Sequence, residues 1–493
     1  MARLHMNPKI SVSVVYVSAM FMAIMDITIV NVALPTLGRE FHVRPAGVEA
    51  VVVAFLVSLA VFIPASGWLG DRFGSKRVLL TAIVIFTVAS VLCGLAQSLT
   101  QLVVFRVLQG VGGGMMTPVG MAMLFRTFRP HERIRASQIL VTPTALAPAL
   151  GPVIGGLLVT ELSWRWVFFV NLPIGLFALA FGLLTLNEHR EPEPGRFDRA
   201  GFVLAGAGLA SVMYAVSEGP FRGWGSPSIV IAGLAGTVLL ALMIVVELRI
   251  REPMVDLRLL GDRLFRTTTL VFFVGVSAFL GSLFVVALFF QDGLGASPLL
   301  SGLSTFPEAL GVMLGAQVAT RLYPRLGPRR IIAAGLTAIA ILLGLMSLIG
   351  FGPYSLWEMR VLMFVLGYAM AHVFVPSQAA AFATISRAST GRASTLFNAN
   401  RYLASAVGVA VLSTILAAVG LTKHTAGGVV PNLNGYHFAF ATAAVIALIG
   451  AVGALAISDH AAAPSMRKPD AAAEESEAAA GREHEGAVEP ARA

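Results

Sequence analysis

Long hydrophobic segments separated by short polar loops run along most of the chain. Each segment is about long enough to cross a bilayer as a helix of roughly 20 residues. Fourteen such segments are recognised, at 10–34, 48–67, 78–97, 102–124, 137–160, 166–186, 201–218, 228–247, 267–290, 299–320, 331–351, 359–381, 396–418 and 436–457. The pattern therefore predicts an all-α membrane protein with 14 transmembrane helices.

The composition excludes several classes of protein. Of the 493 residues, 57% are hydrophobic and 12% are charged, whereas about 25% of residues are charged in an average soluble protein. The single cysteine, Cys93, cannot form an intrachain disulfide, and no metal-binding spacing of Cys or His occurs. The sequence also lacks a phosphate-binding G-x-x-x-x-G-K-[ST] loop. We expect neither an enzyme nor an ATP-driven motor, and no cofactor or metal.

The basic residues fall mainly on one side of the predicted membrane. An even number of spans places both termini on the same side of the membrane. Of the 35 Lys and Arg residues, 27 lie near the termini or in loops on that side. Because such residues accumulate in cytoplasmic loops, both termini are predicted to be cytoplasmic. The net charge of +9 thus reflects membrane topology and not nucleic-acid binding. The 31 Arg and 4 Lys fit GC-rich coding, so we expect the inner membrane of a bacterium.

A short pattern recurs in the two halves of the chain. Leu-x-x-Arg-x-Gly-x-basic-Arg stands at 69–77 and again at 322–330, each time after a span that runs inwards. Parallel repeats of this kind build many transporters, although basic loops can also resemble one another by chance. The spacing predicts a six-helix bundle over 1–200, two additional helices and a linker over 201–260, and a second bundle over 261–458. The Ala-, Glu- and Pro-rich residues 459–493 are expected to be a disordered tail.

An acid lies deep in the first span. Asp26 precedes Leu34 by eight residues, which places it about 12 Å below the outer end of the span. Apolar surroundings disfavour the anion, and this suits a group that binds and releases a proton. Arg106 reaches a similar depth in the fourth span, and Gln109 shares its helical face. We expect Asp26 and Arg106 to couple protons, and Asp26 and Gln109 to contact substrate. The alternative is a fixed ion pair that only holds helices together.

A second acid lies within the tenth span. Glu308 follows Pro307 about nine residues into this span. A carboxylate at such a depth can bind a cationic substrate or a second proton. The alternatives are a neutral buried acid and a carboxyl that faces a water-filled crevice without a role.

The fifth span is rich in proline and small residues. Gly151, Pro152, Gly155 and Gly156 follow Pro148 in this span. Proline removes a backbone hydrogen bond and glycine permits close approach of a second helix, so we expect a bent helix packed tightly on a neighbour. Such a helix acts as a hinge or a seal in a transporter; an ordinary packing face is the alternative.

Four segments carry motifs that resemble those of one family. They are Asp26-Ile-Thr-Ile-Val-Asn-Val-Ala-Leu-Pro35, Gly67-Trp-Leu-Gly-Asp-Arg-Phe-Gly-Ser-Lys-Arg77, Arg106-Val-Leu-Gln-Gly-Val-Gly112 and Gly151-Pro-Val-Ile-Gly-Gly156. In this order they resemble the span-one, loop, span-four and span-five motifs of the major facilitator superfamily, and specifically of its fourteen-span drug:proton antiporters. The chain departs from the family pattern at Ala147, where a glycine is expected, and at Pro324, where the first loop has Asp71.

The resemblance implies a mechanism. Two bundles would rock about a central site and export lipophilic, cationic small molecules in exchange for protons. A conformational switch loop would comprise Gly67, Asp71, Arg72, Gly74 and Arg77, with Asp71 and Arg72 holding the cytoplasmic side closed. We expect a monomer surrounded by membrane lipids. A dedicated exporter of one metabolite, antibiotic or lipid is the main alternative, and a receptor or scaffold without transport is a more distant one.

Overall fold

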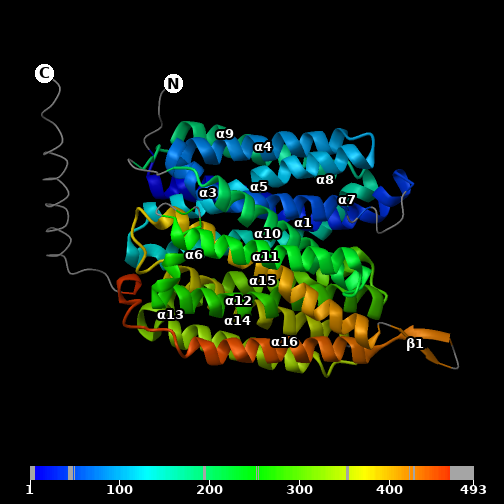
Figure 1. Ribbon diagram of the computed structural model, residues 1–493. Coiled ribbons are helices and arrows are strands. Elements are labelled where there is room, and N and C mark those ends of the chain that lie inside the picture. Colours follow the sequence, from blue (N-terminus) through cyan, green and yellow to red (C-terminus); the bar gives the residue numbers. More distant parts are fainter. Residues whose placement is uncertain are drawn as a thin grey trace, which may run out of the picture.

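Helices that run roughly side by side make up the molecule (Figure 1). The computed structural model describes residues 6–42, 48, 50–191, 196–250, 253, 255–350, 355–420, 422–425 and 428–466. The first half contains α1 (Pro8–Glu40), α3 (Ala50–Phe73), α4 (Ser75–Leu95), α5 (Leu99–Thr127), η1 (Pro130–Glu132), α6 (Arg133–Thr144), α7 (Leu146–Glu161), α8 (Trp166–Phe169) and α9 (Asn171–Thr185).

The second half repeats this helical organisation after two intervening helices, α10 (Arg199–Arg222) and α11 (Pro227–Arg249). It consists of η2 (Leu257–Gly261), α12 (Arg263–Leu288), η3 (Phe289–Gly293), α13 (Pro298–Met346), α14 (Ser355–Ala381), α15 (Thr390–Val419), β1 (Thr422–Thr425), β2 (Gly428–Pro431), α16 (Leu433–Ala454) and η4 (Ala463–Ser465). Helices suit these apolar segments because every backbone N–H and C=O within a bilayer needs a partner inside the protein.

The predicted number of spans agrees with the structure. Thirteen helical segments of the described chain are long and apolar enough to cross a membrane. One of them, Leu299–Met346, contains two spans, because α13 is broken at Gly327, where φ is 76°. The predicted all-α fold is confirmed, with one addition that hydropathy did not indicate. β1 and β2 form an antiparallel hairpin between α15 and α16, and Figure 1 shows it projecting past the helix ends.

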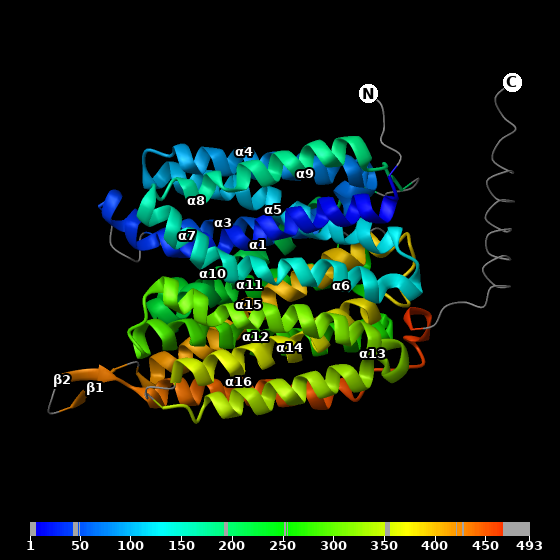
Figure 2. The ribbon, with the colours of Figure 1, turned by 180° about the vertical axis from the view of Figure 1, so that it is seen from behind.

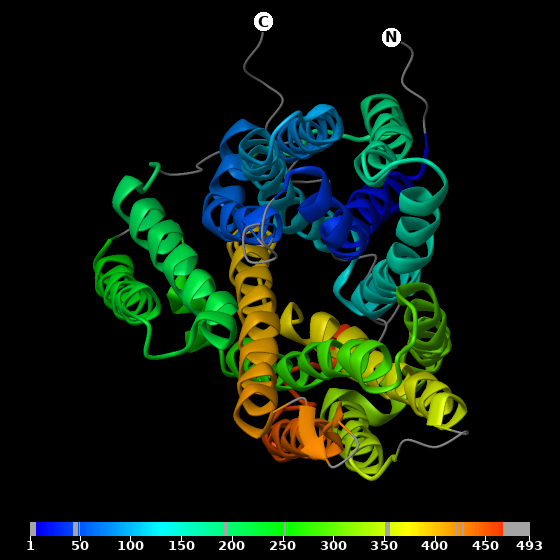
Figure 3. The ribbon, with the colours of Figure 1, turned by 90° about the vertical axis from the view of Figure 1, so that its right-hand side faces the viewer.

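The two ends of the molecule can be named from these features. The terminal end is the one at which α1 begins and α16 ends, and the hairpin end carries β1 and β2 (Figures 1 and 2). Viewed from the hairpin end, α1–α9 form one bundle and α12–α16 form a second, with α10 and α11 to one side (Figure 3). The bundles meet where α3 and α5 contact α15 and where α6 and α7 contact α13.

The two copies of the recurring loop pattern have the same local geometry. Gly74 and Gly327 both adopt a positive φ, at 98° and 76°. In each copy a distant carboxylate accepts a hydrogen bond from the backbone N–H two residues later. Glu188 Oε1 accepts from Lys76 at 2.9 Å, and Asp459 Oδ1 accepts from Arg329 at 2.9 Å. The internal repeat inferred from sequence is therefore also present in the backbone conformation and the capping contacts.

The predicted tail begins too early. Residues 459–466 are folded against α13, because Asp459 caps the chain after Gly327 and the hydroxyl of Tyr323 lies 2.8 Å from Ser465 Oγ. Composition alone did not reveal these two contacts. Residues 467–493, the remainder of the predicted tail, lie outside the described residues.

Candidate functional site

A fully buried polar cluster lies inside the first bundle. Asp26 on α1, Arg106 and Gln109 on α5, and Asn171 at the start of α9 have no exposed surface. The structure thus brings together the three residues that the sequence analysis placed at one depth, and it adds Asn171. Because a buried charge is costly unless it is paired, the hydrogen bonds of this cluster decide what it can do.

Three donors converge on the carboxylate of Asp26. Arg106 Nη1 pairs with Oδ2, while Gln109 Nε2 and Asn171 Nδ2 donate to Oδ1 at 2.8 and 2.9 Å. A carboxylate that accepts from a guanidinium and two amides is matched to its charged form. The arrangement therefore represents the deprotonated state of Asp26.

The guanidinium of Arg106 is positioned by its other contacts. Nε donates to the carbonyl of Val51 at 3.1 Å, and Nη1 also donates to Gln109 Oε1 at 2.8 Å. The ring of Phe55 lies 4.3 Å from Arg106 Cζ, which adds a cation–π contact. Nη2 has no hydrogen-bond partner among the described residues. Arg106 is thus fixed between α1 and α3, and Asp26 is the one described acid that balances its charge.

Asn171 was missed by the sequence analysis, and Ser90 was missed with it. Asn171 Nδ2 lies 3.0 Å from Ser90 Oγ, and Ser90 donates to the carbonyl of Phe168 at 2.9 Å. These residues connect Asp26 to α4 and to the junction of α8 and α9. Asn171 lies five residues inside the predicted span 166–186, and no charge or motif beside it marked it as a partner of Asp26.

The glycines of the fifth span pack directly beside Asp26. A Cβ built on Gly151 would clash with the side chain of Thr28, and one on Gly155 would lie 2.8 Å from Ile29 Cγ1. Both partners are on α1, within three residues of Asp26. Gly156 has no atom within 4 Å of such a Cβ, so it takes no part in this contact. The span is divided into α6 and α7, and the side chain of Pro152 lies outside the described part of the structure.

Glu308 is not part of this cluster. It lies on α13 of the second bundle and is 7% exposed. Its backbone approaches α14 closely, since a Cβ on Gly367 would overlap the Glu308 carbonyl. No described residue forms an ion pair or a side-chain hydrogen bond with its carboxyl group. Glu308 is therefore a second buried acid in the spans, separate from the Asp26 cluster.

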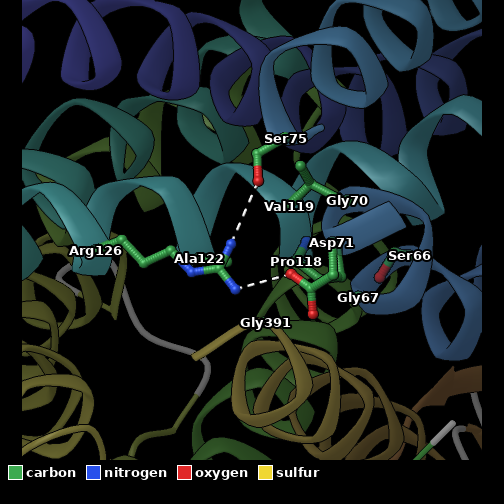
Figure 4. Close-up of a pocket in the computed structure, with 10 residues that line it drawn as sticks. All are labelled: Ser66, Gly67, Gly70, Asp71, Ser75, Pro118, Val119, Ala122, Arg126 and Gly391. Atoms are coloured by element: carbon green, nitrogen blue, oxygen red, sulfur yellow. Dashed lines mark hydrogen bonds and ion pairs between the residues drawn. The ribbon is translucent and has the colours of Figure 1, made fainter. Parts of the chain in front are cut away.

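A second polar site lies at the terminal end, between the bundles. Asp71, Arg126 and Gly391 line a small pocket there, together with Ser66, Gly67, Gly70, Ser75, Pro118, Val119 and Ala122 (Figure 4). Arg126 Nη2 forms an ion pair with Asp71 Oδ1 at 2.8 Å. Its Nε donates to the carbonyl of Arg387, which follows α14. Arg126 thereby joins the end of α3 to the second bundle.

Other contacts close the same end of the molecule. The rings of Phe125 and Phe382 stack with centroids 4.6 Å apart, and Arg133 Nη1 donates to the Phe382 carbonyl. Asn398 Nδ2 lies 3.2 Å from Met121 Sδ. The hydrogen bonds identified between the two bundles, within the described ranges, all lie at the terminal end. The structure is therefore in a conformation closed at that end.

The residues of the predicted switch loop have different environments. Gly67 packs against Gly391 and Thr395 of α15, whereas Gly74 lies against Glu188. Arg77 is largely exposed and forms an ion pair with Glu188 at 3.7 Å. Arg72 is exposed and forms no hydrogen bond or ion pair with a described residue. The partner of Asp71 is therefore Arg126, which the sequence analysis did not single out.

Comparisons with known proteins agree with this architecture. The family model described as Major Facilitator Superfamily matches residues 16–409 and 270–486. The "Multidrug resistance protein B homolog" of Mycobacterium tuberculosis is 33% identical over 408 residues, covering 82% of this chain and 75% of that protein. The "Putative multidrug resistance protein MdtD" of Pectobacterium atrosepticum is 33% identical over 405 residues, covering 80% and 84%.

Two solved structures share the fold. The human organic anion transporter MFSD10 (TETRAN) aligns with a TM-score of 0.66 and 16% identity, covering 91% of this chain and all of that one. The proton:xylose symporter XylE aligns with a TM-score of 0.60 and 14% identity, covering 91% and 95%. With these matches over most of its length, the chain belongs to the Major Facilitator Superfamily and is an integral membrane transporter, not an enzyme.

Proposed function

We propose that the protein is a proton-coupled antiporter that exports lipophilic, cationic compounds across the inner membrane of a bacterium. The observation that carries the proposal is the buried Asp26–Arg106 pair, which lies inside the first bundle of a superfamily transporter. Relatives named for multidrug resistance, at 33% identity, support export of several chemically unrelated drugs. The substrates are small molecules, and protons supply the energy.

The distribution of basic residues supports a cytoplasmic location for the terminal end. The conformation closed at that end is then outward-facing, and α1–α9 and α12–α16 are the two bundles that rock during alternating access. In residue numbers these bundles correspond to 1–200 and 261–458, with the additional helices in 201–260. The chain functions as a monomer in contact with membrane lipids.

The proton step begins at Asp26. Protonation removes the negative charge that balances Arg106, so the ion pair weakens and the guanidinium must find another partner. The change occurs on α1 beside Thr28 and Ile29, against which the glycines of α7 pack. Because α7 also contacts α13 of the second bundle, a shift of α1 is transmitted to the bundle interface.

Glu308 supplies the negative charge for a cationic substrate. The residue is 7% exposed and its carboxyl group has no ion-pair partner among the described residues, so a bound cation would balance its charge. A carboxylate in low-dielectric surroundings attracts a cation more strongly than one in water does. Substrate at Glu308 and a proton at Asp26 would occupy different bundles, which permits exchange between them.

The test uses purified protein in liposomes with an imposed pH gradient. Proton flux is followed on addition of a lipophilic cation such as ethidium. We expect substrate-dependent flux in the natural protein, its loss in Asp26→Asn, and its retention in Asp292→Asn, which alters an exposed acid in η3. Flux that persists in Asp26→Asn would refute proton coupling at this residue.

The breadth of substrates requires a second measurement. Binding of a panel of unrelated lipophilic cations to the purified protein distinguishes multidrug export from a dedicated function. Several binders with similar affinity are expected. A single binder would replace the multidrug proposal with a dedicated exporter.

A further inference from the structure

The nitrogen and the oxygen of the Asn171 side-chain amide differ in their hydrogen bonding within the Asp26 cluster. Its Nδ2 donates both to Asp26 Oδ1, at 2.9 Å, and to Ser90 Oγ, at 3.0 Å. Its Oδ1 is buried and has no hydrogen-bond partner among the described residues. The amide is thus bound through one side only, and its carbonyl oxygen is free to accept a hydrogen bond.

Gln109, the other amide at Asp26, is bound on both sides. Its Nε2 donates to Asp26 at 2.8 Å, and its Oε1 accepts from Arg106 Nη1 at 2.8 Å. Rotation of this amide by 180° would direct Nε2 towards another donor and break the contact with Arg106. Gln109 is therefore fixed for as long as Arg106 stays in place, and Asn171 is not.

Protonation changes what Asp26 requires from its neighbours. The carboxylate only accepts hydrogen bonds, whereas the protonated carboxyl group has an O–H that needs an acceptor. Proton binding at Oδ1 forms one O–H bond and breaks no covalent bond. Rotation of the Asn171 amide then brings its unused oxygen to the new O–H. Because that oxygen also faces Ser90, the Ser90 hydroxyl must turn from the Phe168 carbonyl towards Asn171.

We propose that Asn171 is an amide switch that senses the protonation of Asp26 and, through Ser90, transmits it to the junction of α8 and α9. This inference rests on the proposed proton binding at Asp26. The charged and titratable groups that face Asp26 are Arg106 on α5 and the thiol of Cys93 on α4. The described parts of α8 and α9 contain no titratable residue, and α7 has only Glu161 at its far end. Asn171 is a positioning residue in this scheme, since the proton itself is held by Asp26.

Infrared difference spectroscopy on the purified full-length protein tests the switch. Spectra recorded at acidic and alkaline pH should show a protonated-carboxyl band that disappears in Asp26→Asn. They should also show a change in a side-chain amide carbonyl band that disappears in Asn171→Leu. An amide change that persists in Asn171→Leu would overturn the switch. So would an acid-induced carboxyl band that is not accompanied by any amide change.

A second pair of variants keeps the test independent of the folding of Asn171→Leu. Ser90→Ala removes the next hydroxyl of the relay and leaves Asp26 and Asn171 intact. Ser413→Ala is the matched control, because the partners of this buried hydroxyl among the described residues are carbonyls of its own helix, α15. We expect the acid-induced amide band to shift in Ser90→Ala and proton-driven flux in liposomes to fall about tenfold, the range for loss of one buried hydrogen bond. Ser413→Ala should match the natural protein.

The outcomes separate the inference from the proposed function. If Ser90→Ala retains the amide band and the flux of the natural protein, the relay is wrong while proton coupling stands. If the natural protein shows no carboxyl band that depends on Asp26, Asp26 is not the proton site, and the proposed function and the switch both fail at that residue.

Discussion

Close packing of α7 on α1 can be tested with two identical substitutions on one helix. Gly151→Ala places a Cβ against Thr28, whereas Gly156→Ala meets no atom within 4 Å. Both changes replace a glycine within a helix by alanine. This replacement by itself stabilises the folded state by roughly 0.5–1 kcal/mol. This contribution is similar in the two variants, so their difference isolates the helix contact.

The size of the difference follows from the geometry. A Cβ added to Gly151 would lie 2.8 Å from Thr28 Cβ and 3.1 Å from the backbone N of Ile29, while ordinary contact begins at 3.4 Å. The contact with Thr28 Cβ is about 0.6 Å too short and that with Ile29 N about 0.3 Å too short. Rotation of Thr28 about χ1 moves neither atom, so the helices must separate. Overpacking of this kind costs about 1–3 kcal/mol.

Unfolding from mixed micelles by increasing SDS measures the two free energies. We expect Gly151→Ala to be less stable than Gly156→Ala by about 1–3 kcal/mol. Proton-coupled flux should fall in Gly151→Ala alone, because Asp26 is two residues from Thr28. Equal stability and equal flux of the two variants would refute the inference that α7 constrains the position of Asp26.

Two further predictions concern the second bundle and its contact with the first. Arg126→Gln removes the guanidinium that pairs with Asp71 and donates to the Arg387 carbonyl of the second bundle. Spin labels at the terminal ends of α3 and α15 should therefore show a larger population of long distances. Arg135→Gln, at an exposed position of α6, should leave the distances unchanged. An unaltered distance distribution in Arg126→Gln would contradict its role in closure. Glu308→Gln should weaken the binding of a permanently charged lipophilic cation about tenfold, which is the range for one charge-assisted contact. Binding of a neutral analogue should be unaffected. Calorimetry measures both affinities. Equal losses for both ligands would contradict charge recognition by Glu308.

The fold could be predicted largely because membrane helices obey simple constraints. Runs of about 20 apolar residues and an uneven distribution of arginine identified the spans without any knowledge of tertiary contacts. The repeat at Gly74 and Gly327 was visible because a positive φ favours glycine, and glycine is easily recognised in a sequence. The hairpin β1–β2 and the folded residues 459–466 were not predicted, since each depends on pairing between segments and not on hydropathy.

The Asp26 cluster could be predicted only in part. Depth along a helix placed Asp26, Arg106 and Gln109 together, because the rise per residue is constant. Depth alone could not identify Asn171, which is 145 residues from Asp26 and begins a helix of its own. Only the packing of α9 against α1 and α4 brings its amide to the carboxylate.

The ion pair at the terminal end shows why sequence patterns identify a switch more easily than its partners. Asp71 and Arg72 are adjacent in a helix, so their side chains diverge by about 100° and cannot both face the second bundle. Arg126 takes the contact with Asp71, and it belongs to the same helix as Arg106. The two arginines are 20 residues apart, a rise of about 30 Å along α5. A displacement of α5 that follows neutralisation of Asp26 therefore acts on Asp71 and on the carbonyl of Arg387 at the far end of the helix. If Asp26 binds a proton as we propose, proton binding and opening of the terminal end are coupled through this one helix.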